Sequence, residues 1–179
     1  MWLLLTLSST RQTKIFFSAS NKSPMTLVFA EKGKQLGATL FTPCPQWETF
    51  RIDDAKIIWQ PGVFGGDGTE NRVNICFQSS DGEAAIHEYE ECLFGKVCSC
   101  VKGEGLRHIK AKMSWDKVKF YDADSNKLLK PPNLAGYSCN VMFAIKGKWF
   151  TSGQSGLSLE VTNIQLLEHT EEEQECPFS

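Results

Sequence analysis

The sequence lacks a long apolar stretch. Its first apolar run, Trp2–Leu7, has only six residues, whereas a membrane-spanning helix needs about 20 and the core of a secretory signal peptide is also longer. Residues 1–30 contain no acid and many Ser and Thr. We expect residues 1–24 to be a disordered, dispensable leader; the alternatives are an organellar transit peptide or an extension upstream of a start at Met25.

Histidine is scarce, and no familiar catalytic string is present. The three His residues lie far apart, and the chain has no Gly-x-Ser-x-Gly, His-Glu-x-x-His or Gly-Lys-Ser/Thr motif. The acidic pairs Asp53-Asp54 and Asp122 with Asp124 are typical of turns. A metal-holding enzyme built from such scattered carboxylates is the alternative. We expect a protein that is not an enzyme and that uses no cofactor and no metal.

The cysteines form no recognisable set. Seven Cys residues are present, an odd number without a repeated spacing. Cys98 and Cys100 are too close for a Cys-x-x-Cys zinc pair. We therefore expect reduced thiols and an intracellular protein.

The net charge is the sum of two opposite regions. The chain as a whole carries −2 at pH 7, which on its own argues against a nucleic-acid partner. Between Lys102 and Lys148, however, ten Lys or Arg residues stand against four acids, a net charge of +6. Residues 171–175 carry four acids and no base. A basic segment and an acidic tail therefore cancel in the total.

Alternating apolar and polar residues predict short strands of a half-buried sheet. The alternation is clear in 72–78 and clearest in 137–149, where we expect Lys146 and Lys148 on the face opposite Trp149. In 109–120 and in 157–166 the apolar phase shifts by one residue. Such shifts predict β-bulges, which bend strands as small barrels require.

One helix is expected from about Asp81 to Phe94, with Ser80 or Asp81 as its N-cap. Its apolar stripe is Ile86, Tyr89 and Leu93. Five to seven strands, with this helix between the third and the later strands, predict an all-β OB-type (Greek-key) barrel. A jelly roll or an incomplete sandwich is the alternative.

Basic and aromatic residues interleave on the expected strands. A surface that binds single strands needs cations for the phosphates and flat rings on which bases stack, although a run of Lys also suits a simple solvated face. Strand parity places Trp115 and Trp149 with the core, and it leaves the facing of Trp47 and Trp59 undecided. Of the neighbours Phe120 and Tyr121, which point in opposite directions, one should be exposed.

We expect the following residues to contact DNA: Arg72, Lys110, Lys112, Lys117, Lys119, Phe120, Tyr121, Lys146, Lys148, Phe150 and Phe64. Phe64 would do so from a mobile Gly-rich loop at 62–68. The alternative interpretation of this loop is a plain hairpin turn.

The last residues combine charge with an aromatic end. Residues 169–179 have too little apolar content to fold alone, so we expect a disordered tail. Its acids and its Pro-Phe pair suit a peptide that docks into a basic-rimmed pocket of a partner. The expected partner-binding residues are Glu171, Glu172, Glu173, Glu175, Pro177 and Phe178.

This ending resembles the acidic tip of bacterial single-stranded DNA-binding proteins, from which it departs by the added Ser179. The order of short strands, a helix and the closing stretch GKWFTSGQSGLSLEVTNIQLLE is similar to the single-stranded DNA-binding proteins of T7-like phages and large DNA viruses, over residues 35–179. The resemblance implies an OB barrel, replication partners such as polymerase, helicase or primase, and a tail that competes with DNA for the basic groove.

These patterns together predict a leader (1–24), an OB-fold single-stranded DNA-binding domain (25–168) and a partner-binding tail (169–179). The expected function is protection of single-stranded DNA in replication, recombination or repair. The expected location in the cell is the nucleus or a viral replication site, or an organelle if the leader is a transit peptide. Homo-oligomers are allowed, and no membrane contact is expected. A non-enzymatic β-sandwich protein, such as a minor virion component, is the alternative.

Overall fold

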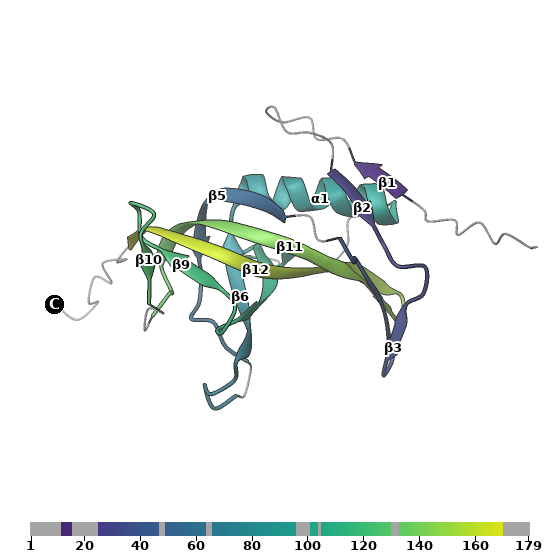
Figure 1. Cartoon of the computed structure of the whole chain (residues 1–179), viewed down its shortest axis with the longest axis horizontal. Helices are drawn as coiled ribbons and strands as arrows, with labels where there is room; N and C mark the ends of the chain where they lie inside the picture. Colours follow the sequence, from purple (N-terminus) through teal and green to yellow (C-terminus); the bar gives the residue numbers. More distant parts are fainter. Residues whose placement is uncertain are drawn as a thin grey trace, which may run out of the picture.

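The computed structural model describes residues 12–15, 25–46, 49–63, 66–95, 101–103, 105–129 and 133–169. They form strands and one helix (Figure 1). The elements are β1 (Gln12–Ile15), β2 (Met25–Val28), β3 (Lys34–Leu36), β4 (Thr39–Pro43), β5 (Thr49–Ile57), β6 (Arg72–Gln78), α1 (Ser80–Phe94), β7 (Val101–Lys102), β8 (His108–Ser114), β9 (Lys119–Tyr121), β10 (Lys127–Leu128), β11 (Tyr137–Thr151) and β12 (Gln154–His169).

Five of the strands close into a barrel. β5 pairs antiparallel with β6, and β6 with β8. β8 runs parallel to β12, where Lys112 lies opposite Glu160. β12 pairs antiparallel with β11, and β11 returns to β5. Numbered along the chain, the barrel strands follow the order 1-2-3-5-4 and back to 1 with one parallel pair, which is the order of an OB-type barrel. This confirms the expected fold, and barrel closure argues against the jelly-roll and sandwich alternatives.

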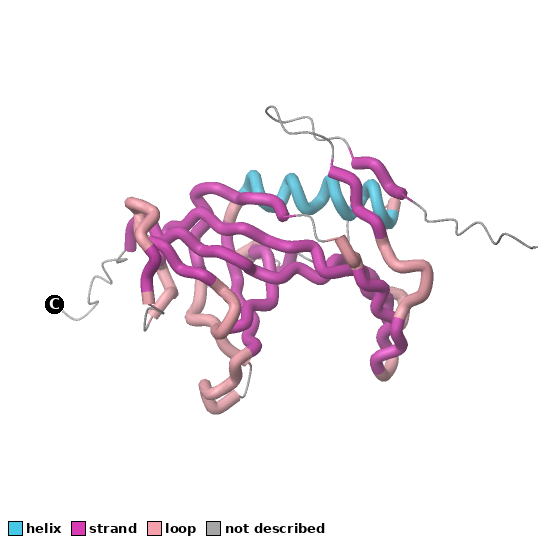
Figure 2. The backbone as a smooth tube through the Cα atoms, viewed as in Figure 1, coloured by secondary structure: helices cyan, strands magenta, loops and turns pink. Residues whose placement is uncertain are grey.

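The helix lies elsewhere in the strand order than the sequence suggested. α1 follows β6, the second barrel strand, whereas the sequence predicted a helix after the third strand. Its N-cap is Ser79, one residue before the expected cap, and the Ser79 hydroxyl accepts a hydrogen bond of 3.1 Å from the Gly82 N–H. α1 lies along one side of the sheet (Figure 2). No helix in the described ranges is long and apolar enough to cross a membrane.

An aromatic cluster joins α1 to the barrel. Tyr89 of α1 is fully buried, and its ring centre lies 5.5 Å from that of Phe50 on β5. Phe50 stacks on Phe143 of β11 at 5.3 Å, and Phe77 of β6 meets Phe143 edge-on at 5.4 Å. Because the inner residues of four elements meet here, their outward neighbours are held at fixed positions on the barrel surface.

Two of the register shifts in the sheet decide which side chains near the candidate site face outward. On β12, Val161 opposes Phe143 and Asn163 opposes Met142, so Thr162 is the extra residue. This confirms the bulge expected in 157–166. A second shift lies between Ile145 and Gly147 on β11, and the sequence did not indicate it. The phase change in 109–120 has another cause, because a turn separates β8 from β9.

Gly147 lies at the second bulge, where β4 pairs with β11. A Cβ atom added there would lie 2.4 Å from the Thr42 carbonyl oxygen and 2.7 Å from the Phe41 ring. We expect Gly147→Ala to lower the free energy of unfolding by about 1–2 kcal/mol, because a paired backbone cannot move aside. Chemical denaturation measures this. Gly105→Ala is the control, since nothing lies near its Cβ position; equal stability of the two variants contradicts the expectation.

Candidate nucleic-acid interface

The outer face of β6 and β8 carries a row of polar and basic side chains. Inward residues such as Ile75 and Ala111 are buried, so the residues between them point away from the core. The cross-strand pairs on the outer face are Cys76 with Lys110, Asn74 with Lys112 and Arg72 with Ser114. Three of the expected DNA contacts, Arg72, Lys110 and Lys112, therefore lie on one face.

Lys112 is crowded by other cations. Its Nζ donates a hydrogen bond of 2.6 Å to the Asn74 side-chain oxygen. Partial burial lowers the pKa of the Lys112 ammonium, and the nearby charges of Lys110 and Arg72 lower it further. Like charges held this close repel one another, and a bound anion relieves that repulsion.

Lys146 and Lys117 extend this charge around the barrel. Burial lowers the pKa of Lys146, Glu160 raises it, and Lys117 and Arg72 lower it again. Glu160 is 16% exposed, and its Oε2 lies 3.7 Å from a guanidinium nitrogen of Arg72. We call Arg72, Lys110, Lys112, Lys117 and Lys146 the basic cluster. The Glu160 carboxylate lies beside Arg72 and acts on Lys146 within this cluster.

An exposed tryptophan stands at one end of this face. Trp59 follows β5 and is 49% exposed. Its ring meets that of His108, the first residue of β8, edge-on at 4.9 Å. His108 shares the outward phase of Lys110 and Lys112 on β8. Trp59 thus adds a flat apolar ring to the basic face, a role that sequence parity left undecided.

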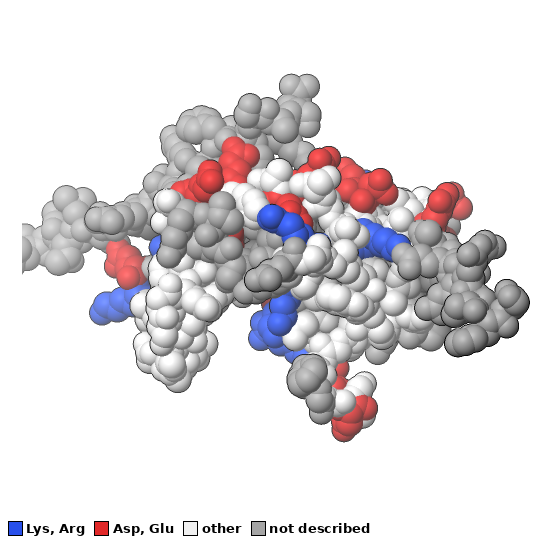
Figure 3. Space-filling model, turned by 180° about the vertical axis from the view of Figure 1, so that it is seen from behind, with Lys and Arg blue, Asp and Glu red and all other residues white. Residues whose placement is uncertain are grey.

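The loop that carries Trp59 is fixed beside β6. The Ile58 N–H donates to the Cys76 carbonyl at 3.0 Å, and Gly62 and Asn74 exchange two backbone hydrogen bonds of 3.1 and 3.0 Å. Beyond this point the described parts of the β5–β6 connection, 58–63 and 66–71, form one protrusion, and the β3–β4 hairpin forms another (Figure 2). Seen from behind, the molecule is hollowed between the two, and a group of Lys or Arg side chains lies there (Figure 3). The other basic groups in this view are separate, and acids gather along the upper edge.

Lys148 and Phe150 lie away from the basic cluster, which corrects the expectation that they share a face with Lys146. The bulge at 145–147 reverses the parity, so Lys148 opposes the buried Leu157. Its Nζ lies 4.7 Å from the ring centre of Phe29. Phe150 is 38% exposed and meets Phe94 edge-on at 5.6 Å.

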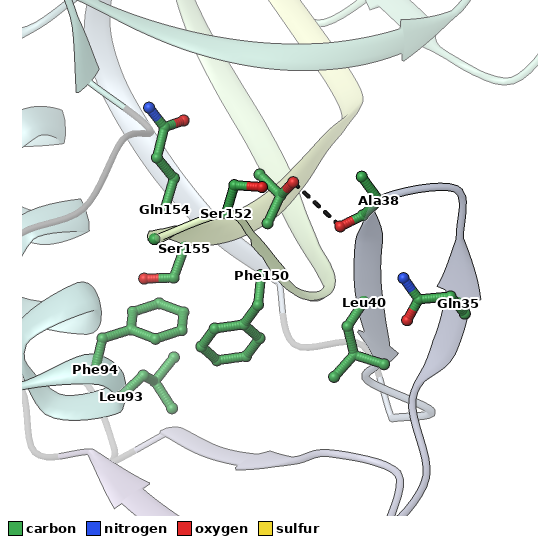
Figure 4. A pocket seen from close by; sticks show the side chains of 11 residues that line it. Gln35, Ala38, Leu40, Leu93, Phe94, Phe150, Ser152, Gln154 and Ser155 are labelled. Atoms are coloured by element: carbon green, nitrogen blue, oxygen red, sulfur yellow. Dashed lines mark hydrogen bonds between the residues drawn. The ribbon is translucent and has the colours of Figure 1, made fainter.

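Phe150 instead lines an apolar pocket of about 520 Å³. Leu93 and Phe94 from the end of α1, Leu40 from β4 and Phe150 from β11 point into it (Figure 4). The Thr151 hydroxyl donates a hydrogen bond of 3.2 Å to the Ala38 carbonyl across its edge.

The remaining expected contacts divide in two. Phe120 is buried, 3% exposed, and stacks with Trp115 at 6.1 Å, so it belongs to the core, which argues against the DNA contact expected for it. Its neighbour Tyr121 is half-buried and points outward, as does Lys119. Phe64 and the partner-binding residues, Glu171, Glu172, Glu173, Glu175, Pro177 and Phe178, lie outside the described residues.

The cysteines and acidic pairs show no second site in the part of the chain that the structure describes. Cys44, Cys76 and Cys139 are thiols outside any disulfide, and burial, with a smaller effect of Asp54, raises the pKa of Cys139 to about 12. Asp122 accepts hydrogen bonds from Asn126, as in a turn. The described ranges bring together no group of three or more His, Cys, Asp or Glu that could hold a metal.

No protein-family model and no curated protein matches the sequence. Solved structures that are similar to it include the following three. The single-stranded DNA-binding protein from bacteriophage Enc34 in complex with single-stranded DNA is 15% identical, over 79% of this chain and 98% of that one, with a TM-score of 0.46. Its C-terminal truncation is 17% identical over the same shares, with a TM-score of 0.47. The gp2.5 protein of bacteriophage T7, a single-stranded DNA-binding protein, is 15% identical over 69% of this chain and 93% of that one, with a TM-score of 0.40.

Proposed function

We propose that this protein binds and protects single-stranded DNA on the outer face of β6 and β8, in replication or recombination. The observation that carries the proposal is the basic cluster, which has three of its five cations on the second and third strands of an OB barrel and Trp59 at its end. These strands form the face on which OB folds bind oligonucleotides. The cations take the phosphates, and the ring of Trp59 takes a base.

The exposed ring favours a single strand over a duplex. In a duplex the bases already stack on one another, whereas an unpaired base offers its face to an aromatic side chain, which is worth roughly 1–3 kcal/mol. The five cations add a term that does not depend on sequence. Binding should therefore prefer single strands of any sequence.

A titration of labelled oligo-dT and of a duplex of the same length, across a salt series, tests the proposal. Each phosphate contact to a single strand contributes about −0.7 to the slope of log K against log salt. If all five cations take part, we expect a slope of roughly −3.5 and weaker binding of the duplex. Failure to bind oligo-dT at low salt, or an affinity that does not change with salt concentration, contradicts the proposal.

Glu160 opposes phosphate binding from within the basic cluster. We expect Glu160→Gln to raise the affinity for oligo-dT by about fivefold at low salt, or roughly 1 kcal/mol, because it removes the carboxylate that lies 3.7 Å from Arg72. Fluorescence anisotropy measures the change. Glu91→Gln, an exposed acid on α1, is the matched control; an equal gain in both variants would show a general charge effect.

The proposal includes the tail, residues 169–179, as the segment that recruits replication proteins. Its support is the sequence alone: four acids followed by Pro177-Phe178. A chain that ends at residue 168 should bind DNA more tightly and should no longer capture a partner that the full chain captures. Unchanged DNA affinity removes the competition, and retained capture removes the recruiting role.

A further inference from the structure

A second, smaller pocket lies on the barrel surface beyond the basic cluster. It has a volume of about 210 Å³ and is formed by β5, β9, β11, β12 and the turn after β9. Its walls include Arg51, Tyr121, Asn140, Met142, Asn163 and Gln165. Figure 1 places β9 and β10 at the end of the barrel opposite β3, so this pocket is distant from the apolar pocket at Phe150.

The bulge at Thr162 creates the pocket. Without the extra residue, Asn163 would continue the inward phase of Val161; with it, Asn163 and Gln165 face outward like Glu160. The register then aligns Lys119, Asn163, Met142 and Arg51 in one row across four strands. Because neighbouring strands are about 4.8 Å apart, the two cations that end this row are roughly 14 Å apart.

Two of the amides in the pocket are fixed by their own hydrogen bonds. The Asp54 N–H donates to the Asn140 oxygen at 3.1 Å, and the Asn140 amide donates to the Gln165 oxygen at 3.0 Å. Gln165 in turn donates to the Ala123 carbonyl and the Ser125 hydroxyl, each at 3.1 Å. These bonds hold the side chains of Asn140 and Gln165 in place.

Asn163 differs from these two amides. Among the residues that the structure describes, none forms a hydrogen bond with its side chain, although the side chain lines the pocket. Its amide offers one donor and one acceptor side by side, the pattern that reads the edge of a nucleobase. Tyr121 lies beside it as a flat ring, and Met142 provides a polarisable floor.

We propose that this pocket receives one base of the bound single strand, stacked on Tyr121 and hydrogen-bonded at its edge by Asn163. Lys119 and Arg51 take the phosphates on either side. The proposal rests on the proposed function. It makes the pocket a second position, besides Trp59, at which the protein senses whether a base is present, whereas the cations of the basic cluster contact only the backbone.

The pocket is within reach of a strand that lies on β8. Lys112 opposes Glu160 on β12, and Lys119 opposes Asn163 on the same strand. Three residues along a strand span roughly 10 Å. Lys117 lies in the turn between β8 and β9 and is exposed, so cations continue from the cluster to the pocket on one surface.

An abasic scan tests the proposal. The probe is a labelled oligo-dT cut to the shortest length that binds with full affinity, in which one base at a time is replaced by an abasic site. One sensitive position should be the base stacked on Trp59, and it should lose its sensitivity in Trp59→Ala. We expect one further position, the base in the pocket, at which the abasic site weakens binding by fivefold or more. The effect should disappear in Asn163→Ala and in Tyr121→Leu, and persist in Gln35→Ala, an exposed amide on β3.

The outcomes separate the pocket from the main interface. If the wild-type protein binds oligo-dT with the expected salt slope but the scan shows no sensitive position beyond the one lost in Trp59→Ala, the base pocket is wrong and the proposed function stands. If both pocket variants bind with the wild-type salt slope and keep the further sensitive position, the assignment to Asn163 and Tyr121 is wrong. If the wild-type protein does not bind oligo-dT at all, the proposed function itself has failed.

Discussion

Replacing Arg72, Lys110 and Lys112 together by Gln is expected to weaken oligo-dT binding by about 100-fold or more at low salt. The three cations share one face, and each takes a phosphate at roughly 1 kcal/mol or more. The slope of log K against log salt should fall by about 2, because three contacts of about 0.7 each are lost. Anisotropy titrations at several salt concentrations measure both quantities.

The matched control removes the same charge elsewhere. Lys32, Lys34 and Lys127 are exposed and lie on the β3 and β10 segments, away from β6 and β8. Changing them to Gln lowers the net charge by the same amount. The loss of affinity should nevertheless be at least tenfold smaller than in the triple variant of Arg72, Lys110 and Lys112. Similar losses in the two triple variants would mean that binding follows net charge and has no defined face.

Trp59→Ala is expected to weaken binding by about 1–3 kcal/mol, a factor of roughly 5 to 150, with the salt slope unchanged. A stacked base releases no counterion, so affinity and salt dependence should separate in this variant. Trp59→Phe should keep most of the affinity while losing most of the fluorescence quenching that DNA causes. Thermal unfolding of each variant checks that the barrel persists without the contact to His108.

Two results would contradict a stacking role for Trp59. One is an affinity for oligo-dT that stays at the wild-type value in Trp59→Ala. The other is quenching that persists in Trp59→Phe, because it would place the stacked base on another of the five Trp residues.

The barrel and its first bulge were accessible from the sequence because both depend on a repeating phase. The apolar run through Val161 shifts to Ile164, and that shift marked the extra residue at Thr162. The bulge at 145–147 leaves no such trace, since Gly147 has no side chain to reveal which way it points. The facing of Lys148 and Phe150 was wrong for this reason.

The site was partly predictable for a similar reason. Lys110 and Lys112 alternate with buried residues, so their outward direction follows from parity. Trp59 shares the parity of the buried Ala55 and Ile57, but β5 ends at Ile57 and parity no longer applies. The place of Glu160 beside Arg72 depends on the closure of the barrel, and no local pattern contains that information.

The most direct test of the central claim is a lysine footprint. Brief acetylation followed by mass spectrometry compares each Lys in the free protein and in the complex with oligo-dT. Binding on the outer face of β6 and β8 predicts protection of Lys110, Lys112, Lys117 and Lys146, with Lys32, Lys34, Lys127 and Lys148 unchanged. Protection of the second group, with Lys110 and Lys112 still reactive, would place the DNA on a different face and contradict the account.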